Sequence, residues 1–168
     1  MSRLNWPVLV VIALLGGGFG EDVDPNAPIM CPPFSTSAKY DKPSTAEERI
    51  EWNTCIPNKD GEAHYHVIEK PALMVKMKNS RKMMQLKLSV LTRHDIFAKL
   101  RVQNHDQALR SVFTERMLEI TEDNIAEPNF RQMLRTDFKT KANELIRSYE
   151  GYDFDLVADV LITSYVVE

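Results

Sequence analysis

Histidine side chains are the first candidates for chemistry in this chain, which has four of them in 168 residues. His64 and His66 would point to the same face of a strand and could begin a metal site, but no third ligand accompanies them. His105 and Asp106 resemble a base and its orienting carboxylate, yet no nucleophile accompanies them. We therefore interpret His64 and His66 as surface residues near a turn, and His105 as a structural or helix-capping residue.

The sequence also lacks the common enzyme signatures. It contains no Gly-x-Ser-x-Gly motif, no glycine-rich phosphate loop and no His-Glu-x-x-His. The formal net charge of −3 argues against general nucleic-acid binding, which requires a basic surface. We expect no catalytic site, no metal site and no cofactor, and a small exported hydrolase is the least favoured of the alternatives.

The first twenty residues have the composition of an export signal. Arg3 precedes an uninterrupted apolar run at residues 8–15, and small residues flank Phe19 just before Glu21. This order is typical of a secretory signal peptide. A retained membrane anchor is the alternative, although the uncharged stretch is at the short end of what spans a bilayer. Both interpretations send the chain after Gly20 to the periplasm.

The two cysteines, Cys31 and Cys55, lie in the segment that would be exported. An oxidising compartment favours a disulfide between them, and the alternative is two unrelated free thiols. Residues 21–63 are rich in proline and have no clear hydrophobic period, so they read as loop unless they are crosslinked. We predict a disulfide, which for a loop of this length contributes roughly 3 kcal/mol.

A β-hairpin is predicted where apolar and polar residues alternate on both sides of a polar turn at Asn79 and Ser80. The apolar positions are Leu73, Val75 and Met77 before the turn, and Leu86, Leu88 and Val90 after it. A period of two residues indicates strands with one buried face. The methionines here are interpreted as core residues rather than as metal ligands.

Two helical segments follow the predicted hairpin. Asp95 is a possible cap for the first, which is either one kinked helix or two helices that meet near Asn104. The second is expected to open at Glu127-Pro128 and to end at Gly151, a residue type that favours helix C-termini. Its apolar stripe consists of Phe130, Leu134, Phe138, Ala142, Leu145, Ile146 and Tyr149.

The last predicted element is a strand within residues 154–167. Both of its faces are largely apolar, which suggests a strand in the interior of a sheet or an edge strand covered by a neighbour. An exposed edge of this kind would invite aggregation. The order strand, strand, helix, helix, strand predicts an α+β fold, in which an antiparallel sheet carries two main helices on one face.

A row of basic residues flanks the apolar stripe of the second helix. Arg131, Arg135 and Lys139 are spaced by four residues, so they share one side of the helix. Their stems could cover apolar surface while their charges stay in water. The alternative is a docking face for an acidic partner or for membrane headgroups.

Three motifs in the last hundred residues resemble the flagellar basal-body-associated FliL family. Residues 105–110 (His-Asp-Gln-Ala-Leu-Arg) resemble its His-x-Pro-x-(Ile/Leu)-Arg helix. Residues 134–137 (Leu-Arg-Thr-Asp) and 142–145 (Ala-Asn-Glu-Leu) resemble its Leu-Arg-x-(Asp/Glu) and Asn-x-Leu helix. Residues 160–168 resemble its terminal Val-x-Phe-Thr-x-Phe-Val-Val-Gln strand. The matching positions are His105, Leu109, Arg110, Leu134, Arg135, Asn143, Leu145, Thr163 and Val166.

The resemblance implies a stomatin-like fold and a single-pass inner-membrane protein with a periplasmic domain. It also implies a non-enzymatic role in flagellar rotation, motility and chemotaxis. The expected partners are stator or basal-body proteins, further copies in a homo-oligomer or ring, and the inner-membrane surface, but not nucleic acid. The alternative is an exported binding or assembly module of the same fold that is not tied to flagella. We expect an export signal or anchor at 1–20, a disulfide-stapled extension at 21–63 and a FliL-like domain at 64–168.

Overall fold

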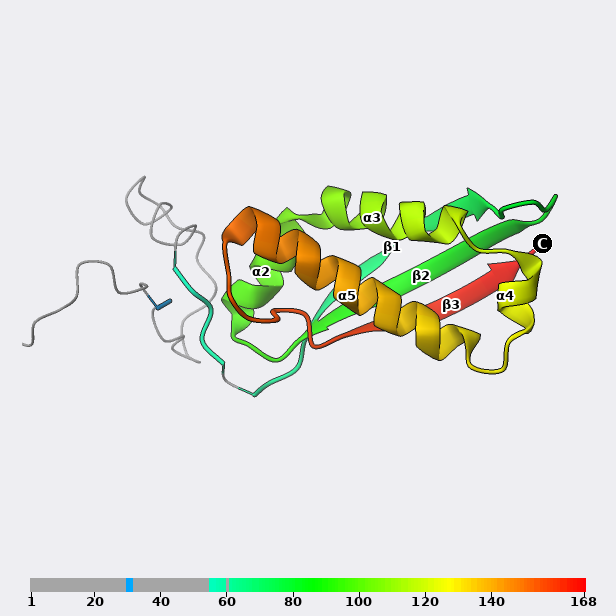
Figure 1. The fold of residues 1–168 in the computed structure, drawn as a ribbon. Helices are drawn as coiled ribbons and strands as arrows, with labels where there is room; N and C mark the ends of the chain where they lie inside the picture. Colours follow the sequence, from blue (N-terminus) through cyan, green and yellow to red (C-terminus); the bar gives the residue numbers. More distant parts are fainter. Residues whose placement is uncertain (1–29, 32–54, 60) are drawn as a thin grey trace, which may run out of the picture.

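The computed structural model describes residues 30–31, 55–59 and 61–168 (Figure 1). The expected signal or anchor at 1–20 and most of the extension at 21–63 lie outside these residues. In chain order the elements are β1 (His64–Lys76), β2 (Met83–Thr92), α2 (Ile96–Asn104), α3 (Asp106–Leu118), α4 (Glu122–Ala126), α5 (Phe130–Glu150) and β3 (Asp159–Val167). This order confirms the predicted α+β class.

The three strands form one antiparallel sheet in the order β1–β2–β3. Asn79 lies in the turn between β1 and β2 with φ 57°, a left-handed conformation that asparagine tolerates better than most residues. The apolar positions predicted for the hairpin are all buried, namely Leu73, Val75, Met77, Leu86, Leu88 and Val90. The alternating pattern therefore predicted the hairpin and its buried face correctly.

The terminal strand does not lie inside the sheet, because among the described strands β3 pairs only with β2. Of the two expected positions, an interior strand and a covered edge strand, the described strands show the edge, and β3 begins at Asp159, later than the first residue of the predicted range. Val160 is fully buried on the face beneath the helices, whereas Val166 on the other face is 37% exposed. Both faces of β3 therefore carry apolar residues, although the helices cover only one of these faces.

The first helical segment is two helices, α2 and α3, which meet at His105. Asp95 caps α2 as predicted, because its carboxylate accepts a hydrogen bond of 3.0 Å from the backbone N–H of Phe97. The short helix α4 was not predicted, although Thr121 and Asn124 form a capping box at its start. The next helix, α5, begins at Phe130, slightly later than the expected Glu127-Pro128.

Helix α5 supplies much of the core. Its buried stripe comprises Phe130, Leu134, Phe138, Ala142 and Ile146, while Leu145 is half-buried. Tyr149, which was expected in the stripe, is 64% exposed. Gly151 ends the helix with φ 72°, the left-handed conformation that favours glycine at this position.

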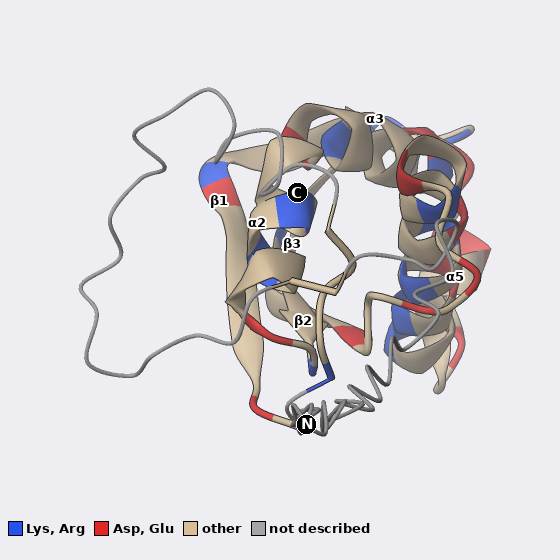
Figure 2. Cartoon of the chain, turned by 90° about the vertical axis from the view of Figure 1, so that its left-hand side faces the viewer, with Lys and Arg blue, Asp and Glu red and all other residues tan. Residues whose placement is uncertain are grey.

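The helices form a layer over one face of the sheet (Figures 1 and 2). α3 packs on β1 and α5 packs on β3, and the two helices contact each other. Phe113 and Phe138, one from each helix, meet with their ring centroids 4.8 Å apart. The described helices leave the opposite face of the sheet open, where Tyr65, Val67 and Met74 are exposed. Charged residues gather along α5 in the end-on view of Figure 2.

Candidate interaction surface

The junction between α2 and α3 directs two neighbouring side chains to different parts of the fold. The Nε2 atom of His105 lies 2.7 Å from a carboxylate oxygen of Glu150, at the end of α5. Asp106 instead faces β1, where its carboxylate lies 2.8 Å from Nε2 of His66. The two residues therefore join different elements and do not form a base with its orienting carboxylate. His66, expected near a turn at the surface, is a partly buried residue within β1.

Arg110 extends this connection along β1. Its Nε donates to Asp106 at 2.7 Å, and its Nη1 donates to the backbone carbonyl of Pro71 at 2.6 Å. Pro71 follows a cis peptide bond in the irregular part of the strand between Ile68 and Leu73. Burial alone would raise the pKa of Asp106, but the hydrogen bonds from Arg110 and His66 outweigh it, so the pKa lies below its ordinary value. The ion pair and hydrogen bonds thus hold α3 against β1.

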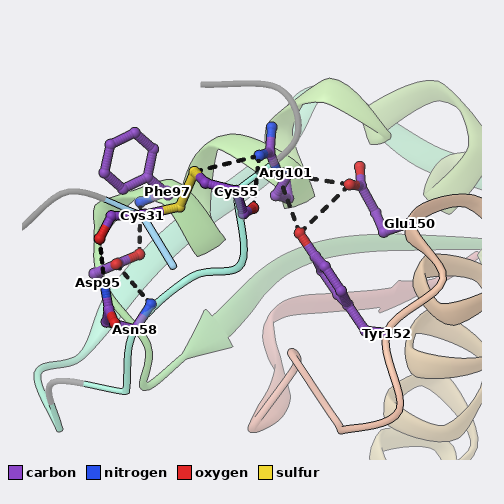
Figure 3. Close-up of a disulfide and its surroundings, with 8 residues drawn as sticks. All are labelled: Cys31, Cys55, Asn58, Asp95, Phe97, Arg101, Glu150 and Tyr152. Carbon is purple, nitrogen blue, oxygen red and sulfur yellow. Dashed lines mark hydrogen bonds and ion pairs between the residues drawn. A yellow bond between two sulfur atoms is a disulfide. The ribbon is translucent and has the colours of Figure 1, made fainter. Parts of the chain in front are cut away.

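The predicted disulfide between Cys31 and Cys55 is present, and both residues are buried (Figure 3). The pair packs against Phe97 of α2 in a small cluster separate from the main core. Asn58 holds the segment in place, because its side chain donates to the carbonyl of Cys31 at 2.6 Å and its backbone N–H donates to Asp95 at 2.7 Å. The disulfide segment is therefore attached to the start of α2.

Arg101 is a buried cation that links the disulfide to α5 (Figure 3). It is 3% exposed, and its guanidinium donates to the carbonyl of Cys55 at 3.1 Å and to the Tyr152 hydroxyl at 3.2 Å. Glu150 lies 3.5 Å away and balances its charge. Burial raises the pKa of Tyr152 although the nearby Arg101 lowers it. The sequence analysis did not identify Arg101 as a buried residue. The one sequence feature that could have indicated it is its position directly before Val102, an apolar residue of the helix that is buried.

Asn143 joins α5 to the segment that leads into β3. Its side-chain amide donates to the carbonyl of Val157 at 2.9 Å, and its amide oxygen accepts from the N–H of Val157 at 2.8 Å. Both residues are buried, so water does not compete for these groups. Leu109 and Leu134, two further positions of the family motifs, lie in the hydrophobic core. These positions therefore contribute to the fold rather than to an open site.

The basic row Arg131, Arg135 and Lys139, here called the basic ridge, runs along α5 above β3. The guanidinium carbon of Arg131 lies 5.0 Å from the ring centroid of Tyr165, a cation–π contact. Burial raises the pKa of Tyr165 although Arg131 lowers it. Arg135 forms an ion pair with Asp159 at the start of β3. The ridge thus covers part of the edge strand with its stems, and its use as a docking face stays a prediction.

Two motif positions on β3 are not buried in the core. Thr163 is exposed where the pairing with β2 shifts register, and Val166 is on the open face of the sheet. A shallow groove of about 410 Å³ lies elsewhere, between α3 and α5. It is lined by Val112, Glu115, Arg116, Glu119, Lys141, Glu144, Leu145 and Ser148. Because its acidic and basic residues nearly balance, the groove has no strong preference for a charged ligand.

The part of the chain that the structure describes holds no group of three histidine, cysteine or acidic residues that could bind a metal ion. None of its helices combines the length and the apolar character needed to cross a membrane.

Comparison of the sequence with known proteins identifies the family of this chain. The family model described as flagellar basal body-associated protein FliL matches residues 67–167, which include most of β1 and all later elements. Cys31 and Cys55 precede the matched region. A search of curated proteins found no match. Because the family model matches more than half of the sequence, the chain belongs to the FliL family of flagellar basal body-associated proteins.

Proposed function

We propose that the chain is a non-enzymatic accessory protein of the flagellar motor, which supports rotation, motility and chemotaxis by binding stator or basal-body proteins. The observation that carries this proposal is the way the fold uses its polar motif residues. His105, Arg110 and Asn143 each bond within the folded unit, to Glu150, Asp106 and Val157. Residues engaged in this way hold elements together and are not available to a substrate.

The surfaces that remain available for binding a partner are faces of the sheet and of α5. The basic ridge on α5, the outer edge of β3 and the open sheet face are neighbours, because α5 packs on β3. Extended surfaces of this kind suit protein partners better than small molecules, which bind in enclosed apolar pockets. Family membership supports a partner among the flagellar components, and further copies in a homo-oligomer or ring belong to the same proposal.

The proposed organisation has three parts. Residues 1–20 direct export, as a cleaved signal or a retained anchor, residues 21–63 form a disulfide-stapled extension, and residues 64–168 form the binding domain. The domain then lies in the periplasm beside the inner membrane. The disulfide supports this placement, because disulfides persist in oxidising compartments.

A strain that lacks the gene tests the role. It should swim more slowly and spread less in soft agar, and the full-length chain should restore both. A fluorescently tagged copy should gather at flagellar bases, and a reporter active only in the periplasm should work when fused after Glu168. Unchanged swimming speed and spreading would contradict the motor role, whereas activity of a cytoplasm-only reporter in the same fusion would contradict the location.

A further inference from the structure

The two outer edges of the sheet differ in how open they are to another strand. The β1 edge is interrupted by the irregularity between Ile68 and Leu73, which contains Pro71, a residue without a backbone donor. Proline and irregular pairing are features that protect sheet edges from association. The β3 edge contains neither proline nor lysine. Among the described strands, β3 is therefore the edge that is better suited to accept a partner.

The register identifies the backbone groups that face outward from β3. Met83 and Glu168 exchange both backbone hydrogen bonds, at 2.7 and 3.0 Å. In an antiparallel pair such residues alternate with residues whose groups point away. Val166 is two residues before Glu168, so its backbone N–H and C=O groups also face β2. The backbone N–H and C=O groups of Tyr165 and Val167 face the open edge instead. No described strand pairs with these outward groups.

Arg131 and Arg135 of the basic ridge contact β3, and Lys139 follows on the same side of α5. Arg131 covers the ring of Tyr165, and Arg135 is neutralised by Asp159. Arg131 and Lys139 have no carboxylate partner among the residues that the structure describes. A strand added to β3 would place alternate side chains on the same side of the sheet as α5, with Arg131 beside Tyr165 at the edge.

We propose that the outer edge of β3 binds an extended acidic segment of a partner protein as a fourth strand. Backbone hydrogen bonds to Tyr165 and Val167 would fix the segment, as in other cases of strand addition. Its acidic side chains would face Arg131 and Lys139, and the intervening apolar side chains would lie beside Val166 on the open face. This deepens the proposed partner-binding role by stating the chemistry of the partner.

Charge makes a second copy of this chain the poorer occupant. Two β3 edges paired about a twofold axis would bring two basic ridges together, and facing like charges are unfavourable. Pairing of β3 with the β1 edge of another copy would meet the interruption at Pro71. An acidic strand meets neither obstacle.

The first test uses the oxidised full-length protein and a short fluorescent peptide that alternates valine and glutamate, with a valine–lysine peptide as its control. Fluorescence anisotropy should show about tenfold tighter binding of the glutamate peptide, the difference expected from a few partly exposed ion pairs. This preference should shrink as salt is added. N-methylation of the peptide amides that face β3 should abolish binding, whereas N-methylation of the alternate amides should not.

Protein variants separate the backbone contribution from the charge contribution. Val167→Pro removes an outward N–H, and Val167→Ala removes much of the same side chain but keeps that donor, so only the first should lose binding. Replacing Arg131 and Lys139 by glutamine should weaken binding of the glutamate peptide, whereas Lys141→Gln, in the groove between α3 and α5, should not. Thermal unfolding checks that each variant is folded, and the methylated peptides decide the question if Val167→Pro unfolds.

Three results would overturn the proposal. They are equal affinity for the two peptides, binding that is indifferent to the position of N-methylation, and self-association of the wild-type chain that Val167→Pro abolishes. The last result would assign the edge to a second copy. None of them bears on the motility test of the proposed function, which measures the whole chain in the cell and not the partner of this edge.

Discussion

Replacing Asn143 by alanine should weaken the attachment between α5 and the residues that lead into β3. The amide of Asn143 makes two buried hydrogen bonds with the backbone of Val157, at 2.8 and 2.9 Å. Alanine leaves the N–H and C=O of Val157 without these partners, and Val157 is itself fully buried. The change therefore removes a connection and also leaves two buried polar groups unsatisfied.

The size of the effect follows from those two groups. A buried donor or acceptor left without a partner costs about 1–3 kcal/mol, so the two together should cost about 2–4 kcal/mol after some relaxation. A domain of this size is stable by about 5–15 kcal/mol. The corresponding fall in melting temperature is about 10–20 °C, because each kcal/mol shifts a domain of roughly this size by several degrees.

Urea unfolding of the purified full-length protein, followed by circular dichroism, measures the change. Thr140→Ala is the matched control, because Thr140 is an exposed residue on the same helix and should change the free energy of unfolding by less than about 0.5 kcal/mol. If Asn143→Ala were as stable as this control, the two hydrogen bonds would not hold the start of β3, and our account of this motif residue would be refuted.

Three further changes test other parts of the fold. Thiol titration of the unfolded, unreduced protein should detect no free cysteine, and Cys55→Ser should cost about 2–4 kcal/mol of stability; two titratable thiols would contradict the disulfide. The pKa of Asp106 is lowered on folding, so its ionised form adds stability that is present above its ordinary pKa of 3.8 and is lost as the pH falls through the folded value. The stability gap between wild type and Asp106→Asn should accordingly shrink below about pH 3.8 in urea titrations, and a gap that grows there would reverse the sign. Val160→Asp should make the protein unfold or aggregate, because Val160 is fully buried, whereas Glu168→Gln should melt like wild type; a cooperative melt of Val160→Asp near that of wild type would contradict a buried β3.

Local sequence patterns were sufficient for the hairpin and for α5. The alternation around Asn79 predicted one buried strand face, because successive side chains in a strand point to opposite sides. The stripe that begins at Phe130 and the glycine at position 151 predicted α5 and its end, because helical periodicity and left-handed glycine are local properties of the backbone. The disulfide was predictable because the sequence contains only two cysteines and begins with a segment typical of an export signal. The family motifs identified the same region that the family model matches.

Other features depend on contacts between residues distant in the sequence, and no local pattern contains them. An apolar strand looks the same in the sequence whether it lies inside a sheet or at its edge, so the edge position of β3 required the pairing itself. The partners of His66 and Arg101 are likewise set by packing, since 40 residues separate His66 from Asp106 and 46 separate Arg101 from Cys55. Sequence periodicity indicates which face of a helix or strand is buried. The partner of a polar side chain depends instead on which elements pack together around the hydrophobic core. For that reason the sequence alone predicted the hairpin, the main helices and the family, and only the tertiary structure showed that the basic ridge borders β3, an edge strand among the described strands.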